Sequence, residues 1–180
     1  MSNHTPKVEG KEVKRRFQLW LKPSVLDMAD KLYVDDNCGS RSEFIEKAIL
    51  ESGAEVVITH HPSDTNNDHL HTSMACQAAV RLFQRRADIP ALRELWFMEV
   101  LSSTEWSVNS SMNRFQPNVF VEIGKEGVEA KIRALAQYRG VMRPYPHPRS
   151  EEALLGLAAY RGAQAGCNYA EAFECVLRRI

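Results

Sequence analysis

"AEVVITH", residues Ala54 to His60, is the stretch that decides the fold class. Its consecutive apolar residues, Val56 to Ile58, are typical of a strand that is covered on both faces, as strands of parallel sheets are. "RELWFMEV" (93–100) and "NVFVEI" (118–123) predict two further strands. Helical periodicity separates and follows them, in 69–86, in 126–139 and in a helix that Ser150 can cap. The alternation predicts an α/β fold, a partial Rossmann-like and mainly parallel sheet with flanking helices. For the end of the chain, 168–180, periodicity does not decide between strand and helix.

The N-terminal part of the chain has a different pattern. "RRFQLWLKP" (15–23) alternates apolar and polar residues as a strand with one buried face does. An amphipathic pattern follows it, and Ser40 with Glu43 has the spacing of a capping box that starts a second helix. Together these features predict a small strand–helix–helix module at about 14–51, preceded by a flexible basic arm at 1–13. The larger domain then covers 54–180.

Composition limits the function classes. The chain has 180 residues and a formal net charge of zero, which argues against a whole-chain polyanion binder. Basic residues nevertheless outnumber acidic ones before Pro23, so the N-terminal arm can contact a partner. The four cysteines form no CxxC pair, and no apolar run has the length of a membrane span or signal peptide. We therefore expect a reduced cytoplasmic setting and no membrane partner.

The segment "THHPSDTNNDHLH" (59–71) concentrates histidines, carboxylates and amides in a short, turn-rich stretch. Such a segment is either part of a metal site or a solvated polar loop, and residues elsewhere in the chain have to decide between the two.

Residues 54–180 resemble the C-terminal portion of the LmbE-like, or PIG-L, deacetylase family. The resemblance depends on five blocks in the family's order: "EVVITHHPSDTNNDH", "LRELWFMEVLSSTEW", "QPNVFVEI", "MRPYPHPRS" and "RGAQAG…YAEAF". It implies a Rossmann-like sheet and a divalent metal, usually Zn²⁺, that supports hydrolysis of the N-acetyl group of an amino sugar or sugar conjugate.

The same resemblance implies roles for individual residues. His69, which ends the "NxDH" block, matches a metal ligand, and Asn66 and Asp68 are the catalytic candidates, with the Asn66 amide facing the developing oxyanion. The candidates for substrate binding are His60, His61, Asp64, His147, Arg149 and Arg161.

One part of the family's pattern is missing. Family members carry two further metal ligands and a general-base aspartate in an "AHPDDE" block after the first strand, and this sequence has no such block. A catalytic zinc usually needs three protein ligands, and His69 supplies one. Whether His60, His61 and Asp64 converge with His69 on one ion is left open by the sequence. We therefore expect an impaired deacetylase.

Residues 14–51 resemble the ribbon-helix-helix family of DNA-binding proteins, through "RRFQLWLKP" and "GSRSEFIEKAI". In that family the strands of two chains pair into an antiparallel ribbon that enters the major groove of duplex DNA. The resemblance implies base contacts from Arg16, Gln18 and Trp20, and a phosphate contact at the start of the second helix, at Ser40, Arg41 and Ser42.

This second resemblance gives the alternative function, a DNA-binding regulator with a degenerate deacetylase-like domain. The two resemblances overlap between about Phe44 and Gly53, so the helix there can belong to both parts of a fused chain. A ribbon module completes its apolar face only with a second copy, and the larger part lacks its leading strand units. Both features predict a homodimer or a larger oligomer.

Overall fold

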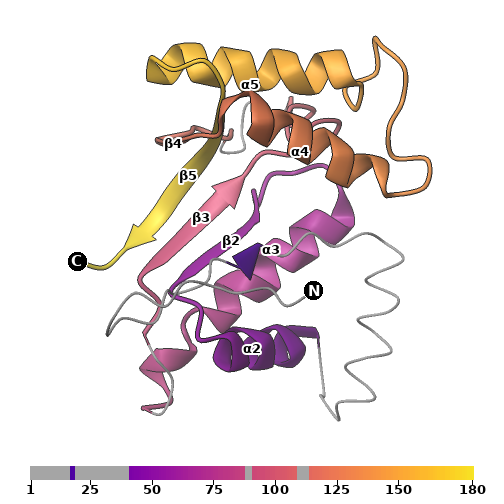
Figure 1. Cartoon of the computed structure of the whole chain (residues 1–180). Coiled ribbons are helices and arrows are strands. Elements are labelled where there is room, and N and C mark those ends of the chain that lie inside the picture. Colours follow the sequence, from indigo (N-terminus) through magenta and orange to yellow (C-terminus); the bar gives the residue numbers. More distant parts are fainter. Residues whose placement is uncertain (1–16, 19–40, 88–90, 109–113) are drawn as a thin grey trace, which may run out of the picture.

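The computed structural model describes residues 17–18, 41–87, 91–108 and 114–180 (Figure 1). Five strands form one sheet in the order β1-β2-β3-β5-β4. They are β1 (Phe17–Gln18), β2 (Val56–His60), β3 (Glu94–Met98), β4 (Val119–Glu122) and β5 (Ala170–Arg178). The helices are α2 (Arg41–Ser52), α3 (Asn67–Ala79), α4 (Gly124–Ala136) and α5 (Glu151–Ala165), and a short 3₁₀ turn, η1 (Leu82–Gln84), follows α3. The α/β class expected from the sequence is confirmed.

The direction of one strand refines the expectation of a mainly parallel sheet. β1, β2 and β3 pair in parallel, whereas β5 is antiparallel to both of its neighbours, β3 and β4. β4 therefore runs in the same direction as β3, and β5 alone runs against the rest. Two helices, α4 and α5, precede β5, so the chain crosses the sheet once more than in a strand–helix–strand unit and re-enters it reversed. The sheet is mixed for this reason, and residues 170–178 are a strand.

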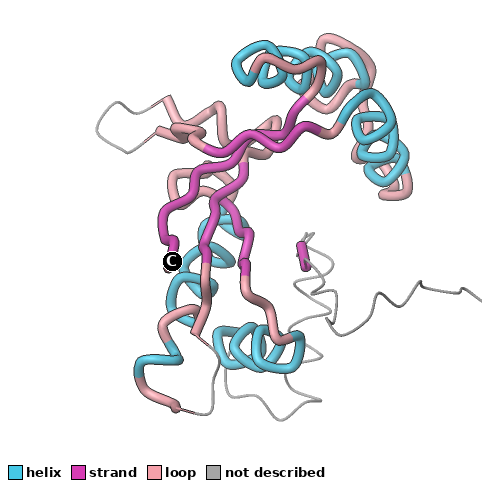
Figure 2. Tube along the Cα trace, turned by 60° about the vertical axis from the view of Figure 1, so that its left-hand side comes forward, coloured by secondary structure: helices cyan, strands magenta, loops and turns pink. Residues whose placement is uncertain are grey.

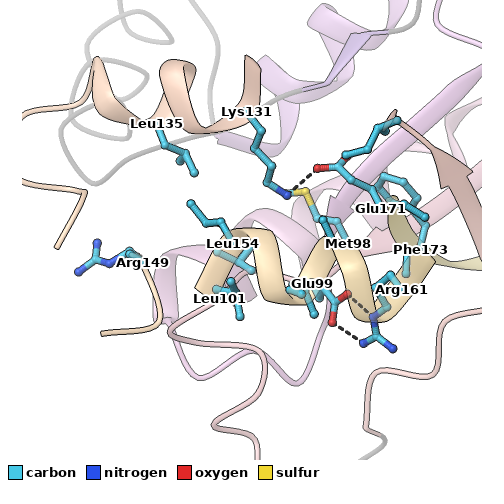
Figure 3. A pocket seen from close by; sticks show the side chains of 16 residues that line it. Met98, Glu99, Leu101, Lys131, Leu135, Arg149, Leu154, Arg161, Glu171 and Phe173 are labelled. Atoms are coloured by element: carbon cyan, nitrogen blue, oxygen red, sulfur yellow. Dashed lines mark hydrogen bonds and ion pairs between the residues drawn. The ribbon is translucent and has the colours of Figure 1, made fainter. Parts of the chain in front are cut away.

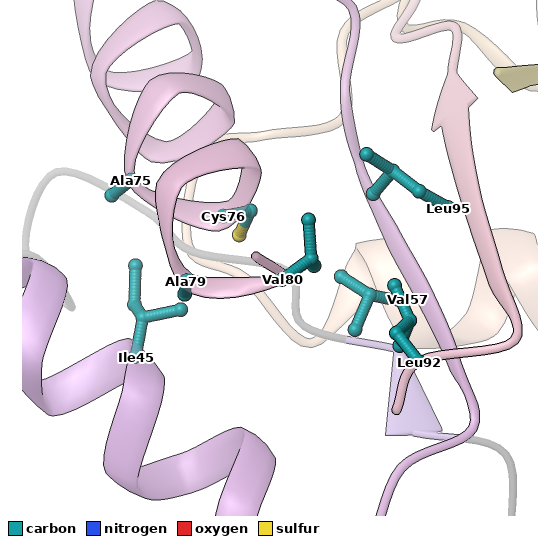
Figure 4. Close-up of a cluster of buried hydrophobic side chains, with 8 residues drawn as sticks. All are labelled: Ile45, Val57, Ala75, Cys76, Ala79, Val80, Leu92 and Leu95. Atoms are coloured by element: carbon teal, nitrogen blue, oxygen red, sulfur yellow. The ribbon is translucent and has the colours of Figure 1, made fainter. Parts of the chain in front are cut away.

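Two helix pairs flank this sheet (Figures 1 and 2). α2 and α3 pack together beside β2, while α4 and α5 pack together beside β4 and β5. Because successive strand residues point to opposite faces, the sheet divides its apolar side chains between two clusters. Val57 and Leu95 face α3, in a cluster with Ile45 of α2 (Figure 4). Trp96 and Met98 pack with Phe173 on the other face.

The helix ends follow local sequence signals. Asn66 caps α3, and the Ser150 hydroxyl accepts a hydrogen bond from the Ala153 N–H at the start of α5, as the sequence predicts for this serine. α5 ends at Gly166, whose φ of 75° lies in the left-handed region that glycine adopts without strain. The expected helix at 69–86 is shorter and starts earlier, because the Asn66 cap fixes its first turn at Asn67.

The N-terminal arm (1–13) and most of the 14–40 segment lie outside the described residues, so the division into an N-terminal module and a 54–180 domain remains a proposal. Two described pieces of the module contact the rest of the chain. Gln18 of β1 pairs with Ile58, and Ile45 of α2 is part of the cluster around Val57. α2 thus contributes to the same core as the sheet. None of the helices described is long and apolar enough to cross a membrane.

Two glycines of α5 provide a matched test of this packing. A Cβ added at Gly162 would lie 2.6 Å from the backbone oxygen of Asn168, whereas one added at Gly156 meets nothing within 4 Å. We expect Gly162→Ala to lower the free energy of unfolding by about 1–3 kcal/mol, because backbone must shift. Gly156→Ala should raise it by up to about 1 kcal/mol, since alanine favours the helix. Urea unfolding of both variants measures this, and equal effects would contradict the close approach of α5 to 167–168.

Candidate active site

The segment between β2 and α3 is folded into the protein. His60, His61, Ser63 and Asp64 are all buried. The Asn66 side chain then accepts hydrogen bonds from the backbone N–H groups of Asp68, at 2.9 Å, and His69, at 3.4 Å. This cap places His69 in the first turn of α3 and leaves the Asn66 Nδ2 group as the donor that can reach a ligand. The interpretation of 59–71 as a solvated loop is therefore wrong for its first half.

Asp64 holds this segment together. Its side chain is 0% exposed, and its Oδ1 accepts from the Asn66 N–H at 2.9 Å and lies 3.1 Å from His69 Nδ1. The second oxygen, Oδ2, accepts from Thr104 Oγ1 at 2.8 Å and from Ser103 Oγ at 3.0 Å. Burial by itself raises the pKa of Asp64, but the hydrogen bonds from His69, the Asn66 N–H and Thr104 together lower it below its ordinary value. The carboxylate is thus kept ionised and fully hydrogen-bonded.

The Asp64 carboxylate orients His69. Because Nδ1 donates its proton to Asp64, the other ring nitrogen of His69, Nε2, carries the lone pair. A buried carboxylate that holds the far nitrogen of an imidazole is the usual support of a metal-binding histidine. Ser103 Oγ lies 3.4 Å from the same Nδ1. Since Nδ1 already faces Asp64, this contact does not make Ser103 an activated nucleophile.

His60 stacks on His69, with ring centroids 4.1 Å apart and an angle of 14° between the ring planes. Burial, and then the neighbouring His69, lower the pKa of His60 to about 4, although Asp64 opposes this. A metal ion lies in the plane of each imidazole that binds it. Two nearly parallel rings stacked at this distance share no such point, so His60 and His69 do not converge on one ion.

His61 faces away from His69. Its Nδ1 accepts from the Ser63 N–H and lies 2.7 Å from Ser63 Oγ, while its Nε2 is 3.3 Å from Glu174 Oε2. The ring also makes edge contacts with Phe97 and Phe115. Burial lowers the pKa of His61, and Glu174 opposes this shift. His61 is therefore a buried connection between the segment after β2 and β5.

The question left open by the sequence now has an answer for the part of the chain that the structure describes. No group of three or more histidine, cysteine, aspartate or glutamate side chains there can hold a metal ion. Both oxygens of Asp64 are engaged, His60 is stacked and His61 is turned away. A three-ligand zinc site does not fit the described residues alone.

The other candidate substrate ligands lie apart from His69. His147 Nδ1 accepts from the Arg149 N–H at 3.0 Å, in the turn before α5. Arg161 forms a two-point ion pair with Glu99, at 2.8 and 2.6 Å. Arg149 and Arg161 lie at opposite ends of a cavity of about 80 Å³ between α4, α5 and the sheet (Figure 3). They do not act on one group at the His69 site.

Two solved structures are similar in fold to this chain. One is the conserved protein TT1542 from Thermus thermophilus, with a TM-score of 0.58 and 23% sequence identity, matched over 76% of this chain and 58% of that one. The other is an N,N'-diacetylchitobiose deacetylase from Pyrococcus horikoshii, with a TM-score of 0.55 and 17% identity, over 76% of this chain and 51% of that one. No protein-family model and no curated protein matches.

These comparisons confirm the likeness to a deacetylase fold that the sequence blocks imply. At these identities the likeness is one of fold. The chain spans only 58% and 51% of the two solved structures, so a substantial part of each has no counterpart in the match.

Residues beyond the predicted set complete the surroundings of Asp64 and His61. Ser103 and Thr104, from the turn after β3, bind Asp64, and Glu174 of β5 contacts His61. β2 and β3 are parallel neighbours, so the segments that follow them meet at one edge of the sheet. The polar "SST" sequence after the β3 strand signal therefore could have identified Ser103 and Thr104. Nothing local to Glu174 indicates its role.

The candidate DNA contacts are placed only in part. Gln18 is in β1 and pairs with Ile58, and Arg41 and Ser42 begin α2. Arg16, Trp20 and Ser40 lie outside the described residues. The helix start expected after Ser40 is thus found at Arg41.

The low pKa of His60 gives a prediction for the metal-free protein in chelator. His60 titrates near 6.5 when unfolded and at about 4 when folded, so its contribution to stability is fully present above pH 6.5 and is lost as the pH falls toward 4. Full protonation would cost on the order of 3 kcal/mol. We expect His60→Leu to flatten the pH dependence of urea unfolding between pH 6.5 and 4. A slope equal to that of the wild type would show that His60 is not buried in its neutral form.

Proposed function

We propose that this chain carries the His69 side of a metal-dependent N-acetyl-sugar deacetylase site, and that it is impaired as a hydrolase by itself. The observation that carries the proposal is the contact between Asp64 Oδ1 and His69 Nδ1, which directs the His69 lone pair away from the buried carboxylate. A polar loop without a ligand-binding role has no need of a fully hydrogen-bonded carboxylate beneath one histidine.

The fold and the sequence blocks support the chemical class. The fold is similar to that of a solved protein named as an N,N'-diacetylchitobiose deacetylase, and the "NxDH" block places His69 at the metal-ligand position of the family that the sequence resembles. In such a site Asn66 would direct its Nδ2 donor at the oxyanion, with Asp68 beside it in the first turn of α3. An N-acetylated amino sugar is the proposed substrate.

The proposed impairment follows from the number of ligands. A catalytic zinc takes three protein ligands and a water, and the described residues bring one imidazole to the site. We derive no hydrolytic step for this chain alone. Further ligands would have to come from residues outside the described ranges or from a second polypeptide.

Zinc titration of the full chain, followed by ¹⁵N NMR of the histidine rings, tests this proposal. We expect zinc to shift His69 Nε2 with an affinity weaker than micromolar, because one imidazole holds the ion. His69→Ala should remove this binding, and Asp64→Asn should weaken it about tenfold. His71→Ala is the matched control, since His71 is an exposed histidine of the same helix.

Acetate release from N-acetylglucosamine, measured in the same samples, completes the test. The expected rate is that of buffer with zinc. Micromolar zinc affinity with turnover would overturn the proposed impairment, and a zinc response that survives His69→Ala would overturn the assignment of the ligand.

As a second function we propose duplex DNA binding by a dimer of the N-terminal module. The supporting observation is that α2 starts at Arg41, where the ribbon-helix-helix resemblance puts the helix that contacts phosphate. In the single chain, however, β1 pairs in parallel with β2. A ribbon pairs two chains in antiparallel fashion, so β1 would have to leave the sheet edge when the ribbon forms.

A salt-dependent shift of duplex DNA distinguishes these two arrangements. If the ribbon forms, Arg16→Ala and Gln18→Ala should each weaken sequence-specific binding about tenfold, which corresponds to loss of one base contact. Lys125→Ala removes an exposed charge from α4 and is the control for general electrostatics. Equal DNA affinities for all four proteins at low and moderate salt would exclude the ribbon.

A further inference from the structure

A second cavity, of about 320 Å³, lies beside the candidate active site. The turn after β3 forms one wall, Phe115 lies on another side, and Leu157 and Arg161 of α5 complete it. Its volume is in the range of small-molecule sites, whereas the neighbouring cavity of about 80 Å³ between α4 and α5 is too small for a sugar ring.

Thr104 connects this cavity to the His69 site. It lines the cavity, and its hydroxyl donates to Asp64 Oδ2 at 2.8 Å. Phe115 makes a second connection, because it lines the cavity and contacts the His61 ring at a centroid distance of 5.8 Å. A ligand in the cavity would therefore lie one side chain away from the carboxylate that orients His69.

The charges around the cavity are balanced and mostly engaged. Glu99 and Arg161 pair with each other, and Glu105 accepts the backbone N–H groups of Ser102 and Ser103. Arg114 is a further cation at the rim. Two acidic and two basic side chains favour neither an anion nor a cation. They do offer fixed donors and acceptors beside apolar walls, which suits a neutral ring that carries hydroxyl groups.

We infer that this cavity is a subsite for one neutral sugar ring, adjacent to the His69 site and independent of metal. The inference rests on the proposed function for the choice of a sugar, but the binding it describes needs neither His69 nor hydrolysis. The ring would contact Phe115 and Leu157 with its apolar face and exchange hydrogen bonds with the Arg161–Glu99 pair.

Saturation-transfer NMR and calorimetry with N-acetylglucosamine test the subsite, on the full chain in chelator. Ser107 lines the cavity, and its hydroxyl makes no hydrogen bond within the described part of the chain, so Ser107→Phe fills the space without removing a known side-chain contact. We expect the sugar to bind the metal-free wild type and His69→Ala alike, and Ser107→Phe to weaken it at least about tenfold. Ser52→Phe, at an exposed serine of α2, is the matched control and should bind as the wild type does.

Several outcomes would overturn the subsite. They are no sugar binding in chelator, equal affinity in Ser107→Phe and the wild type, or tighter binding of glucose 6-phosphate than of N-acetylglucosamine, which would show an anion site. Circular dichroism melts of both phenylalanine variants identify a loss that comes from misfolding. If Ser107→Phe melts early, Leu157→Trp repeats the test from the α5 wall of the cavity.

The two proposals fail separately in these experiments. Sugar binding that Ser107→Phe removes, in a protein where zinc does not respond to His69→Ala, supports the subsite and sinks the metal-site proposal. Zinc binding through His69, with no effect of Ser107→Phe on sugar, does the reverse.

Discussion

The arrangement of the candidate site depends on one buried carboxylate. Asp64 is withdrawn from water and accepts hydrogen bonds from the segment after β2, from α3 and from the turn after β3. An unpaired charge at that depth would be strongly destabilising, so the three segments are held where their donors reach it. The Asn66 cap, the His69 ring and the Thr104 hydroxyl all take their positions from this requirement.

The same constraint separates orientation from coordination. Asp64 uses both of its oxygens on protein donors, so it supports His69 and is not itself available to an ion. His60 stacks on His69 and is kept neutral by burial, which covers one face of the ligand histidine without adding a second lone pair to the same point. The result is one well-supported imidazole, which explains how a site can be carefully built and still lack the ligands for catalysis.

The sheet explains why distant sequence blocks meet. Parallel β2 and β3 bring the polar segments that follow them to one edge, and β5, which returns between β3 and β4, adds Glu174 beneath His61. The cavity bounded by Phe115 and Arg161 lies next to this edge because α5 packs over β5 and β4. A partial sheet is thus sufficient to assemble one wall of a binding site.

Local sequence determined the elements that need only their own residues. The apolar run at Val56–Ile58 gave a buried strand, Ser150 gave a capped helix, and the "NxDH" spacing gave a histidine in the first turn of α3. Tertiary structure decided the rest. It set the reversed direction of β5, the engagement of Asp64 by Ser103 and Thr104, and the pairing of Arg161 with Glu99. These features depend on which segments meet in space, and the periodicity of a segment records its own buried face without naming the partner that covers it.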